Sequence, residues 1–170
     1  MQNNIGRKVA FGGFVTALSI ICLYMASILP TNRLFFYAIG SMFIFTIVIE
    51  FGVPFAAVTY LATTALAFII IPNKIMLIPY LLFFGYYGII KYYVEKLNHL
   101  VLEWMIKLAL FNTALYVTYW VVTKMLLETV TFYAYIWVTI ILAEIAFVIY
   151  DLGYSMIIGY YKRKLRNRIR

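Results

Sequence analysis

The sequence predicts an all-α membrane protein, a polytopic bundle of about six transmembrane helices with both ends in the cytoplasm. Of its 170 residues, 66% are hydrophobic and 12% are charged, whereas soluble domains are about 45–50% apolar and about 25% charged. A soluble fold of this length still exposes about 30% of its unfolded-chain surface, so the apolar excess must face lipid. The apolar runs are long and continuous, which favours helices over the short alternating strands of a membrane barrel.

Six apolar segments are long enough to cross a bilayer, since a helical span needs about 20 residues and must pair its own backbone groups. In chain order, they cover residues 8–29, 34–50, 54–71, 75–96, 99–127 and 131–161. Pro30 ends the first segment, and Pro72 ends the third. Gly52 and Pro54 form the turn between the second and the third. We predict a single transmembrane domain, followed by a basic tail over 162–170.

The last three segments are longer than the second and third. Pro79 lies near the start of the fourth segment, where its missing N–H costs little. His99 opens the fifth segment, and the sixth runs directly into the basic tail. Because the second and third segments are short, five spans with these two fused is the alternative.

Basic residues in short loops predict the orientation, because they accumulate on the cytoplasmic side. With the N-terminus inside, that side holds most of them, namely Arg7, Lys8, Lys91, Lys96 and those of the tail. The outer side then holds only Arg33, Lys74 and Lys124. A composition rich in lysine, isoleucine and tyrosine points to a bacterium, so the predicted location is the bacterial plasma membrane.

The tail over 162–170 is the main basic cluster of a chain whose net charge is +8. Its basic residues are Lys162, Arg163, Lys164, Arg166, Arg168 and Arg170. Such a run can bind nucleic acid. Directly after an apolar helix, contact with anionic lipid headgroups is the better interpretation. We therefore predict lipid contact and no nucleic-acid partner.

Polar residues inside the spans need a reason, because a charge at the bilayer centre costs on the order of 2.5–3.5 kcal/mol. Glu144 is predicted near the midplane, with Asp151 on the same face of the helix. Glu144 either binds a ligand or hydrogen-bonds Asn112 of the fifth span. Glu103 and Lys107 have i,i+4 spacing, which predicts an ion pair between them.

The outer ends of the spans hold the candidate substrate-binding residues. Arg33, Asn73 and Lys74 belong to two loops that begin with proline, where they can contact an anionic ligand. Aromatic residues at the ends of the last three spans join them: Tyr80, Trp120 and Trp137. These rings either wall a small-molecule site or form the aromatic belt that anchors membrane proteins at the interface.

The first span carries small residues on one face. Ala10, Gly13 and Ala17 are spaced i, i+3 and i+7, and small residues let another helix approach closely in lipid. The partner is either another subunit or the alanine-rich third span of the same chain. Its alanines are Ala56, Ala57, Ala62, Ala65 and Ala67.

Motifs for catalysis are absent from the sequence. It has no phosphate-binding Walker loop, no metal-ligand cluster and no serine-centred nucleophile motif. His99 is the only histidine, and one histidine without matching ligands is poor material for a metal site. We therefore predict neither enzymatic activity nor a cofactor.

The helical architecture and the small face of the first span resemble the substrate-binding S-component of energy-coupling factor (ECF) transporters. These are bacterial proteins of about this size, with six helices and both termini inside. Gly13 and Ala17 match the family's Ala-x-x-x-Ala docking motif, with glycine in place of the first alanine. The resemblance implies a subunit that captures a vitamin or similar micronutrient at its outer end. It would then dock through the first helix onto a transmembrane coupling subunit driven by two cytoplasmic ATPases.

In that family, the ligand site lies near the outer halves of the fourth to sixth helices, under the loops after the first and third. By position, the resemblance therefore implies the following substrate-binding residues: Arg33, Asn73, Lys74, Tyr80, Asn112, Trp120, Trp137 and Glu144. Two other functions stay open. One is a stand-alone proton-coupled secondary transporter that uses Glu144, and the other is a membrane scaffold or assembly protein without a small ligand.

Overall fold

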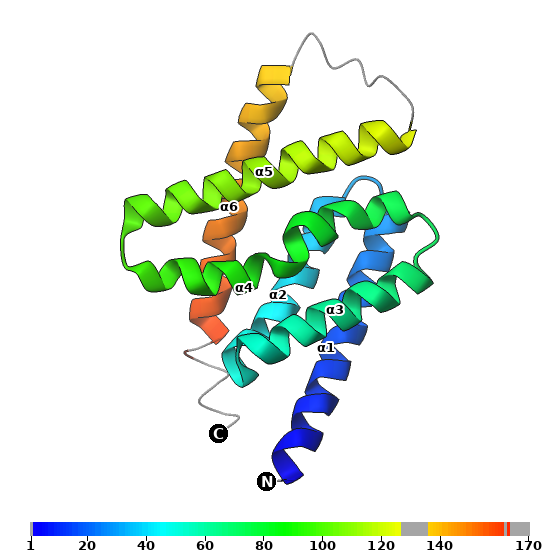
Figure 1. Cartoon of the computed structure of the whole chain (residues 1–170), viewed down its shortest axis with the longest axis vertical. Coiled ribbons are helices and arrows are strands. Elements are labelled where there is room, and N and C mark those ends of the chain that lie inside the picture. The colour runs from blue at the N-terminus through cyan, green and yellow to red at the C-terminus, as the bar shows by residue number, and fades with distance from the viewer. Residues whose placement is uncertain (1, 127–135, 162, 164–170) are drawn as a thin grey trace. The chain divides into compact units, whose positions relative to one another are not determined.

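The computed structural model describes residues 2–126, 136–161 and 163, which form helices and no strands. By its internal contacts the chain divides into two units, Met1–Leu127 and Glu128–Arg170. The first unit holds α1 (Gln2–Ile28), α2 (Arg33–Phe51), α3 (Val53–Ile70), η1 (Lys74–Leu77), η2 (Tyr80–Phe84), α4 (Gly85–Val94), η3 (Glu95–Leu97) and α5 (Leu100–Leu126). The second unit holds α6 (Ile136–Tyr160). Each unit is described by itself (Figure 1).

The predicted fold class is confirmed. Within the described residues, 6 helices are long and apolar enough to cross a membrane, namely Ile5–Ile28, Arg33–Phe51, Val53–Ile70, Lys74–Leu97, Leu100–Lys124 and Val138–Tyr160. The second and third segments are separate helices, so six spans describe the chain better than five. The inward orientation of both ends and the single domain stay predictions.

Two residues with positive φ make the tight turns of the first unit. Gly52 joins α2 to α3 with φ 87° and ψ 170°, an extended positive-φ conformation that is essentially restricted to glycine and costs another residue on the order of 1–3 kcal/mol. Asn98 stands between η3 and α5 with φ 52° and ψ 27°, the left-handed helical region that asparagine tolerates better than most residues. Pro54 follows Gly52 in the first turn of α3, where it removes no helical hydrogen bond.

The fourth predicted segment, 75–96, is less regular than its apolar run suggests. A 3₁₀ turn, η1, precedes Pro79, and a π-helical turn, η2, follows it before α4 begins. The physical cause is Pro79, which cannot donate to the carbonyl four residues back and displaces the preceding turn. The wider π turn then closes with the amide of Gly85 donating to the carbonyl of Tyr80.

Other helix boundaries also differ from the predicted ones. α1 begins at Gln2, well before residue 8, because the polar N-terminal residues continue the helix beyond its apolar part. The described part of the sixth span begins at Ile136. Residues 131–135 and most of the tail over 162–170 lie outside the described residues.

Small polar residues join α1 to α2 and α3. The hydroxyl of Ser19 donates to the carbonyl of Gly40 at 3.3 Å, and the hydroxyl oxygens of Thr63 and Thr16 lie 3.4 Å apart. Gly12 lets the ring of Phe55 approach closely, since an added Cβ would lie 3.0 Å from it. Small side chains of this kind allow helix backbones to come close in lipid. In Figure 1, α1 (blue) accordingly lies alongside α2.

A buried cluster at one end of the first unit draws on α1, α2, α3, η1 and η2. Its members are Leu23, Ala26, Tyr37, Ala67, Ile71, Leu77 and Tyr80. Tyr80 is 1% exposed, and its ring lies between two glycines. An added Cβ would lie 3.8 Å from the ring at Gly40 and 3.0 Å from it at Gly85. Tyr60 packs on Gly85 as well and donates its hydroxyl to the carbonyl of Leu81 at 3.0 Å.

Substituting Gly85→Ala should destabilise the first unit, because the new Cβ would stand 2.4 Å from the Tyr60 ring. The ring cannot swing away freely while its hydroxyl is bonded to Leu81. We expect a loss of roughly 1–3 kcal/mol of unfolding free energy, as for other overpacked cores. Thermal unfolding of the purified protein in detergent measures it. Gly13→Ala is the matched control, because nothing lies within 4 Å of an added Cβ there; equal midpoints for both variants would contradict the packing described.

Candidate functional site

A cavity of about 630 Å³ lies at the end of the first unit where the loop between α1 and α2 meets η1. Its polar lining comes from Thr31, Asn32 and Arg33. The remaining lining residues are apolar or aromatic: Pro30, Leu34, Phe35, Tyr37, Ile75, Met76, Pro79 and Val122. Most residues of the loop and of the first turn of α2 are exposed, so the cavity is an open basin. Apolar walls with a few polar groups are the usual composition of a small-molecule site.

Among the described lining residues, Arg33 supplies the only charge. It is the first residue of α2, its Nε atom is buried, and that atom has no hydrogen-bond partner. Arg33 forms no ion pair with any described residue. Asn32 precedes it at the helix N-cap without a side-chain capping bond. A guanidinium stays charged at all ordinary pH values and offers donors in a planar fork. The cavity is therefore positively charged.

Tyr37 holds the two sides of the cavity together. It is 3% exposed, and its hydroxyl on α2 donates to the carbonyl of Met76 in η1 at 2.5 Å. The tilted ring of Phe84 packs against it with 5.6 Å between the ring centroids. Tyr37 and Met76 both line the cavity, so the hydrogen bond between them fixes the distance between its walls. The width of the cavity therefore depends on the buried cluster to which Tyr37 belongs.

Asn73 and Lys74 lie next to this cavity but serve the backbone. The ammonium of Lys74 donates to the carbonyl of Ile71 at 2.7 Å and also to that of Phe68. It also lies over the Phe68 ring, 4.8 Å from the centroid. The side-chain oxygen of Asn73 accepts from the amide of Ile75 at 3.2 Å. Both residues thus cap the end of α3 and the start of η1.

The other predicted substrate-binding residues belong to several helices. Tyr80 is buried in the cluster, and Trp120 is 54% exposed on α5. Asn112 donates its amide to the carbonyl of Leu108 in its own helix at 3.0 Å. Trp137 and Glu144 belong to α6 in the second unit, and the side chain of Trp137 lies outside the described residues. Of the predicted residues that the structure describes in the first unit, only Arg33 lines the cavity.

The small face of α1 points away from the other helices of the first unit. Ala10, Gly13 and Ala17 are all exposed, and an added Cβ at Gly13 would meet nothing within 4 Å. The contacts of α1 with α3 use Gly12 and Thr16 instead. Gly6, which the sequence analysis missed, is also exposed and extends the same face by one turn. Its signal was the Gly6-x-x-x-Ala10 spacing. The alanines of α3 are therefore not the partner of this face.

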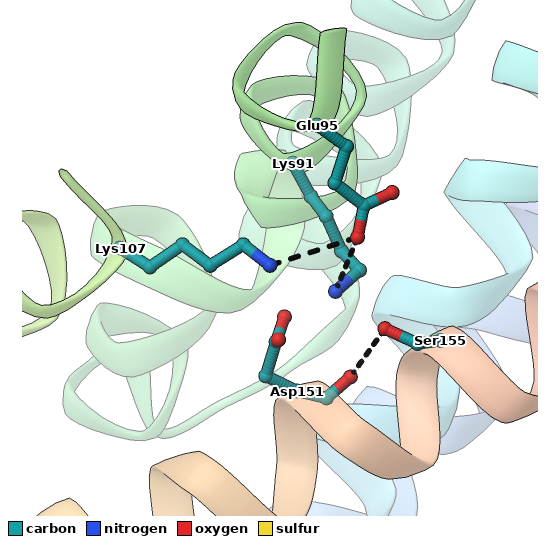
Figure 2. A network of polar contacts seen from close by, with 5 residues as sticks. All are labelled: Lys91, Glu95, Lys107, Asp151 and Ser155. Atoms are coloured by element: carbon teal, nitrogen blue, oxygen red, sulfur yellow. Dashed lines mark hydrogen bonds and ion pairs between the residues drawn. The ribbon is translucent and has the colours of Figure 1, made fainter. Parts of the chain in front are cut away.

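An ion network joins α4, η3 and α5 (Figure 2). One carboxylate oxygen of Glu95 lies 2.9 Å from the Lys91 ammonium and 3.6 Å from that of Lys107. The predicted pair of Glu103 with Lys107 is wrong, because Lys107 pairs with Glu95 and Glu103 forms no ion pair with a described residue. The left-handed turn at Asn98 folds α5 back beside α4. This turn brings Glu95 to the Lys107 ammonium, so Lys107 pairs with Glu95 of η3 and not with Glu103 of its own helix.

In the second unit, α6 carries Glu144 and Asp151. The hydroxyl of Ser155 donates to the backbone carbonyl of Asp151 at 3.0 Å (Figure 2). The rings of Tyr150 and Tyr154 pack edge to face with 5.5 Å between centroids. Glu144 lies roughly 12 Å along the helix from Ile136, at about 1.5 Å per residue, consistent with a position inside the span. The predicted choice between ligand binding and a bond to Asn112 stays open.

None of the family models, curated proteins or solved structures compared with this chain matches it. Its described residues also contain no group of three or more histidine, cysteine or acidic residues able to hold a metal ion. The cavity, the small face of α1 and the Glu95 network are therefore the features from which a function can be argued.

Glu95→Gln should destabilise the protein, because two buried lysines lose a shared carboxylate. Breaking a fully buried pair costs about 3–5 kcal/mol; Glu95 is partly exposed, so we expect roughly 1–3 kcal/mol. Thermal unfolding in detergent measures the loss. Glu103→Gln on α5 is the control and should leave the midpoint within about a degree. A larger effect for Glu103→Gln would restore the predicted pairing with Lys107.

Lys74→Met should lower stability and leave ligand affinity unchanged, because the ammonium binds the last carbonyls of α3 rather than facing the cavity. Hydrogen bonds from a charged donor contribute about 1.5–3 kcal/mol, less where the donor is exposed. We therefore expect a lower unfolding midpoint together with an unchanged dissociation constant for any small ligand that co-purifies. A loss of affinity without a loss of stability would assign Lys74 to the binding site.

Proposed function

We propose that this protein is the substrate-binding membrane subunit of an ATP-driven importer, of the kind found in ECF transporters. It captures a small ligand at one end of its first unit and docks through α1 onto a transmembrane coupling subunit. Two cytoplasmic ATPases power the complex. In this proposal the cell membrane of a bacterium is the location, with the N-terminus of α1 inside.

The exposed small face of α1 carries the proposal. Four small residues at helical spacing lie on one side of a helix whose opposite side already packs on α2 and α3. In order they are Gly6, Ala10, Gly13 and Ala17. Lipid tails pack equally well on large side chains, so a stripe of small ones facing outward is of use mainly to another helix. No described helix of the first unit supplies that partner.

The distance between the cavity and the small face of α1 supports separate places for ligand binding and for docking. Gly13 lies roughly 25 Å along α1 from Pro30 at the cavity, at about 1.5 Å per residue. This distance approaches the thickness of the hydrocarbon core, about 30 Å. A ligand bound at one membrane surface is therefore compatible with a docking contact in the opposite leaflet.

The alternative of a stand-alone proton-coupled transporter rests on Glu144 alone. It requires transport by the purified protein in liposomes under a proton gradient, without any ATPase. Such transport would replace the importer proposal, and its absence would remove the alternative.

Gly13→Leu and Ala17→Leu should abolish docking, because a leucine on this face holds an approaching helix away. We expect the tagged wild-type chain to co-purify from its host membranes with a coupling subunit and ATPases. Mass spectrometry should find at least tenfold less of these partners with each variant. Ala62→Leu, at an exposed position of α3, is the matched control and should retain them.

Two results would contradict this proposal. One is a wild-type chain that co-purifies with no ATPase from membranes in which it is native. The other is a variant, Gly13→Leu or Ala17→Leu, that fails to fold while Ala62→Leu folds normally, since the face would then pack within the chain.

A further inference from the structure

We infer that the cavity beside α2 binds an amphipathic organic anion, whose single carboxylate or phosphate group pairs with Arg33 and whose apolar body lies on the wall formed by Phe35, Met76 and Pro79. This inference deepens the proposed function by naming the chemical class of the ligand. It rests on the charge, lining and volume of the cavity.

The charge of the cavity indicates an anion. Arg33 forms no ion pair with the described residues, and its buried Nε has no hydrogen-bond partner. A buried donor without a partner is destabilising, and more so when the group is charged. The chain has no acidic residue before Glu50, and Glu50 lies near the opposite end of α2. A planar guanidinium matches carboxylate and phosphate groups with two parallel hydrogen bonds.

The remaining lining indicates an apolar body. Apart from Thr31, Asn32 and Arg33, the walls present proline, aliphatic, methionine and aromatic side chains. The volume of about 630 Å³ falls within the usual range of small-ligand pockets, about 300–1,000 Å³. A fully hydrated inorganic anion would leave these walls uncovered, whereas an anion with an aromatic or alkyl body would cover them.

The ligand can come from two sources with the same chemistry, a free metabolite or an acidic lipid. The chain itself offers one competitor, Glu128, which follows α5 in sequence and lies outside the described residues. The experiment must therefore separate a free anion, a lipid headgroup and an internal ion pair.

The test measures binding of 1-naphthoate, and of its neutral isostere 1-naphthamide, by calorimetry with the full chain in zwitterionic detergent. We expect naphthoate to bind the wild type at least tenfold more tightly than naphthamide. Arg33→Gln should weaken naphthoate about ten- to hundredfold, the loss expected for a charged hydrogen bond. The naphthoate affinity of Arg33→Lys should lie between those of the wild type and Arg33→Gln. The matched control Arg7→Gln on α1 should bind naphthoate as the wild type does.

The lipid arm repeats the titration in nanodiscs of phosphatidylcholine with and without phosphatidylglycerol. Weaker naphthoate binding in the presence of phosphatidylglycerol, in the wild type but not in Arg33→Gln, would support the anion site with a lipid as its occupant. Unchanged naphthoate affinity would support the site with a free metabolite.

Three binding results would overturn the inference. They are equal affinity for naphthoate and naphthamide, equal naphthoate affinity in the wild type and Arg33→Gln, and no measurable naphthoate binding to the wild type in either detergent or phosphatidylcholine nanodiscs. Non-additive losses of stability in Arg33→Gln, Glu128→Gln and the double variant would show an internal ion pair and also overturn it. Gly13→Leu should keep the wild-type naphthoate affinity, so failure of docking and failure of this site are read separately.

Discussion

The close approach of helix backbones around Tyr80 is the constraint on which the rest of the first unit depends. In lipid, apolar side chains gain little by leaving their surroundings, so helices associate through packing and interhelical hydrogen bonds. Gly40 and Gly85 leave room for the Tyr80 ring, and Ser19 links α1 to the carbonyl of Gly40. These contacts set the spacing of α1, α2 and the fourth span.

The cavity is a consequence of this packing rather than of its own residues. Tyr37 belongs to the buried cluster and to the cavity wall at once, and its hydrogen bond to Met76 fixes η1 against α2. The loop between α1 and α2 and the first turn of α2 carry the polar and charged groups of the cavity. The buried cluster determines their positions. The small face of α1 (Gly6, Ala10, Gly13 and Ala17) has the opposite character, since no described residue of the first unit covers it.

The sequence was sufficient for the spans and turns, because lipid makes continuous apolar length a strong signal and because Pro30, Gly52 and Pro72 act locally. The sequence did not predict the correct partner of Lys107. The i,i+4 rule considers a single helix, whereas Glu95 belongs to the preceding element η3. Arg33 was predicted because a cation in a short loop that begins with proline is visible in the sequence. The apolar walls were missed, because Phe35, Met76 and Val122 are distant in the chain and ordinary in type.

The π-helical turn Tyr80–Phe84 sets the angular phase of everything that follows it in the fourth span. A π turn holds one residue more between bonded groups than an α turn, and one residue corresponds to about 100° of rotation about the helix axis. Deleting a single residue from this turn would point Gly85, Gly88 and Lys91 away from the neighbours they now meet. The segment between Pro79 and Lys91 is therefore tolerant of changes in composition at exposed positions but intolerant of changes in length, so insertions and deletions should be rarer there among related chains than substitutions.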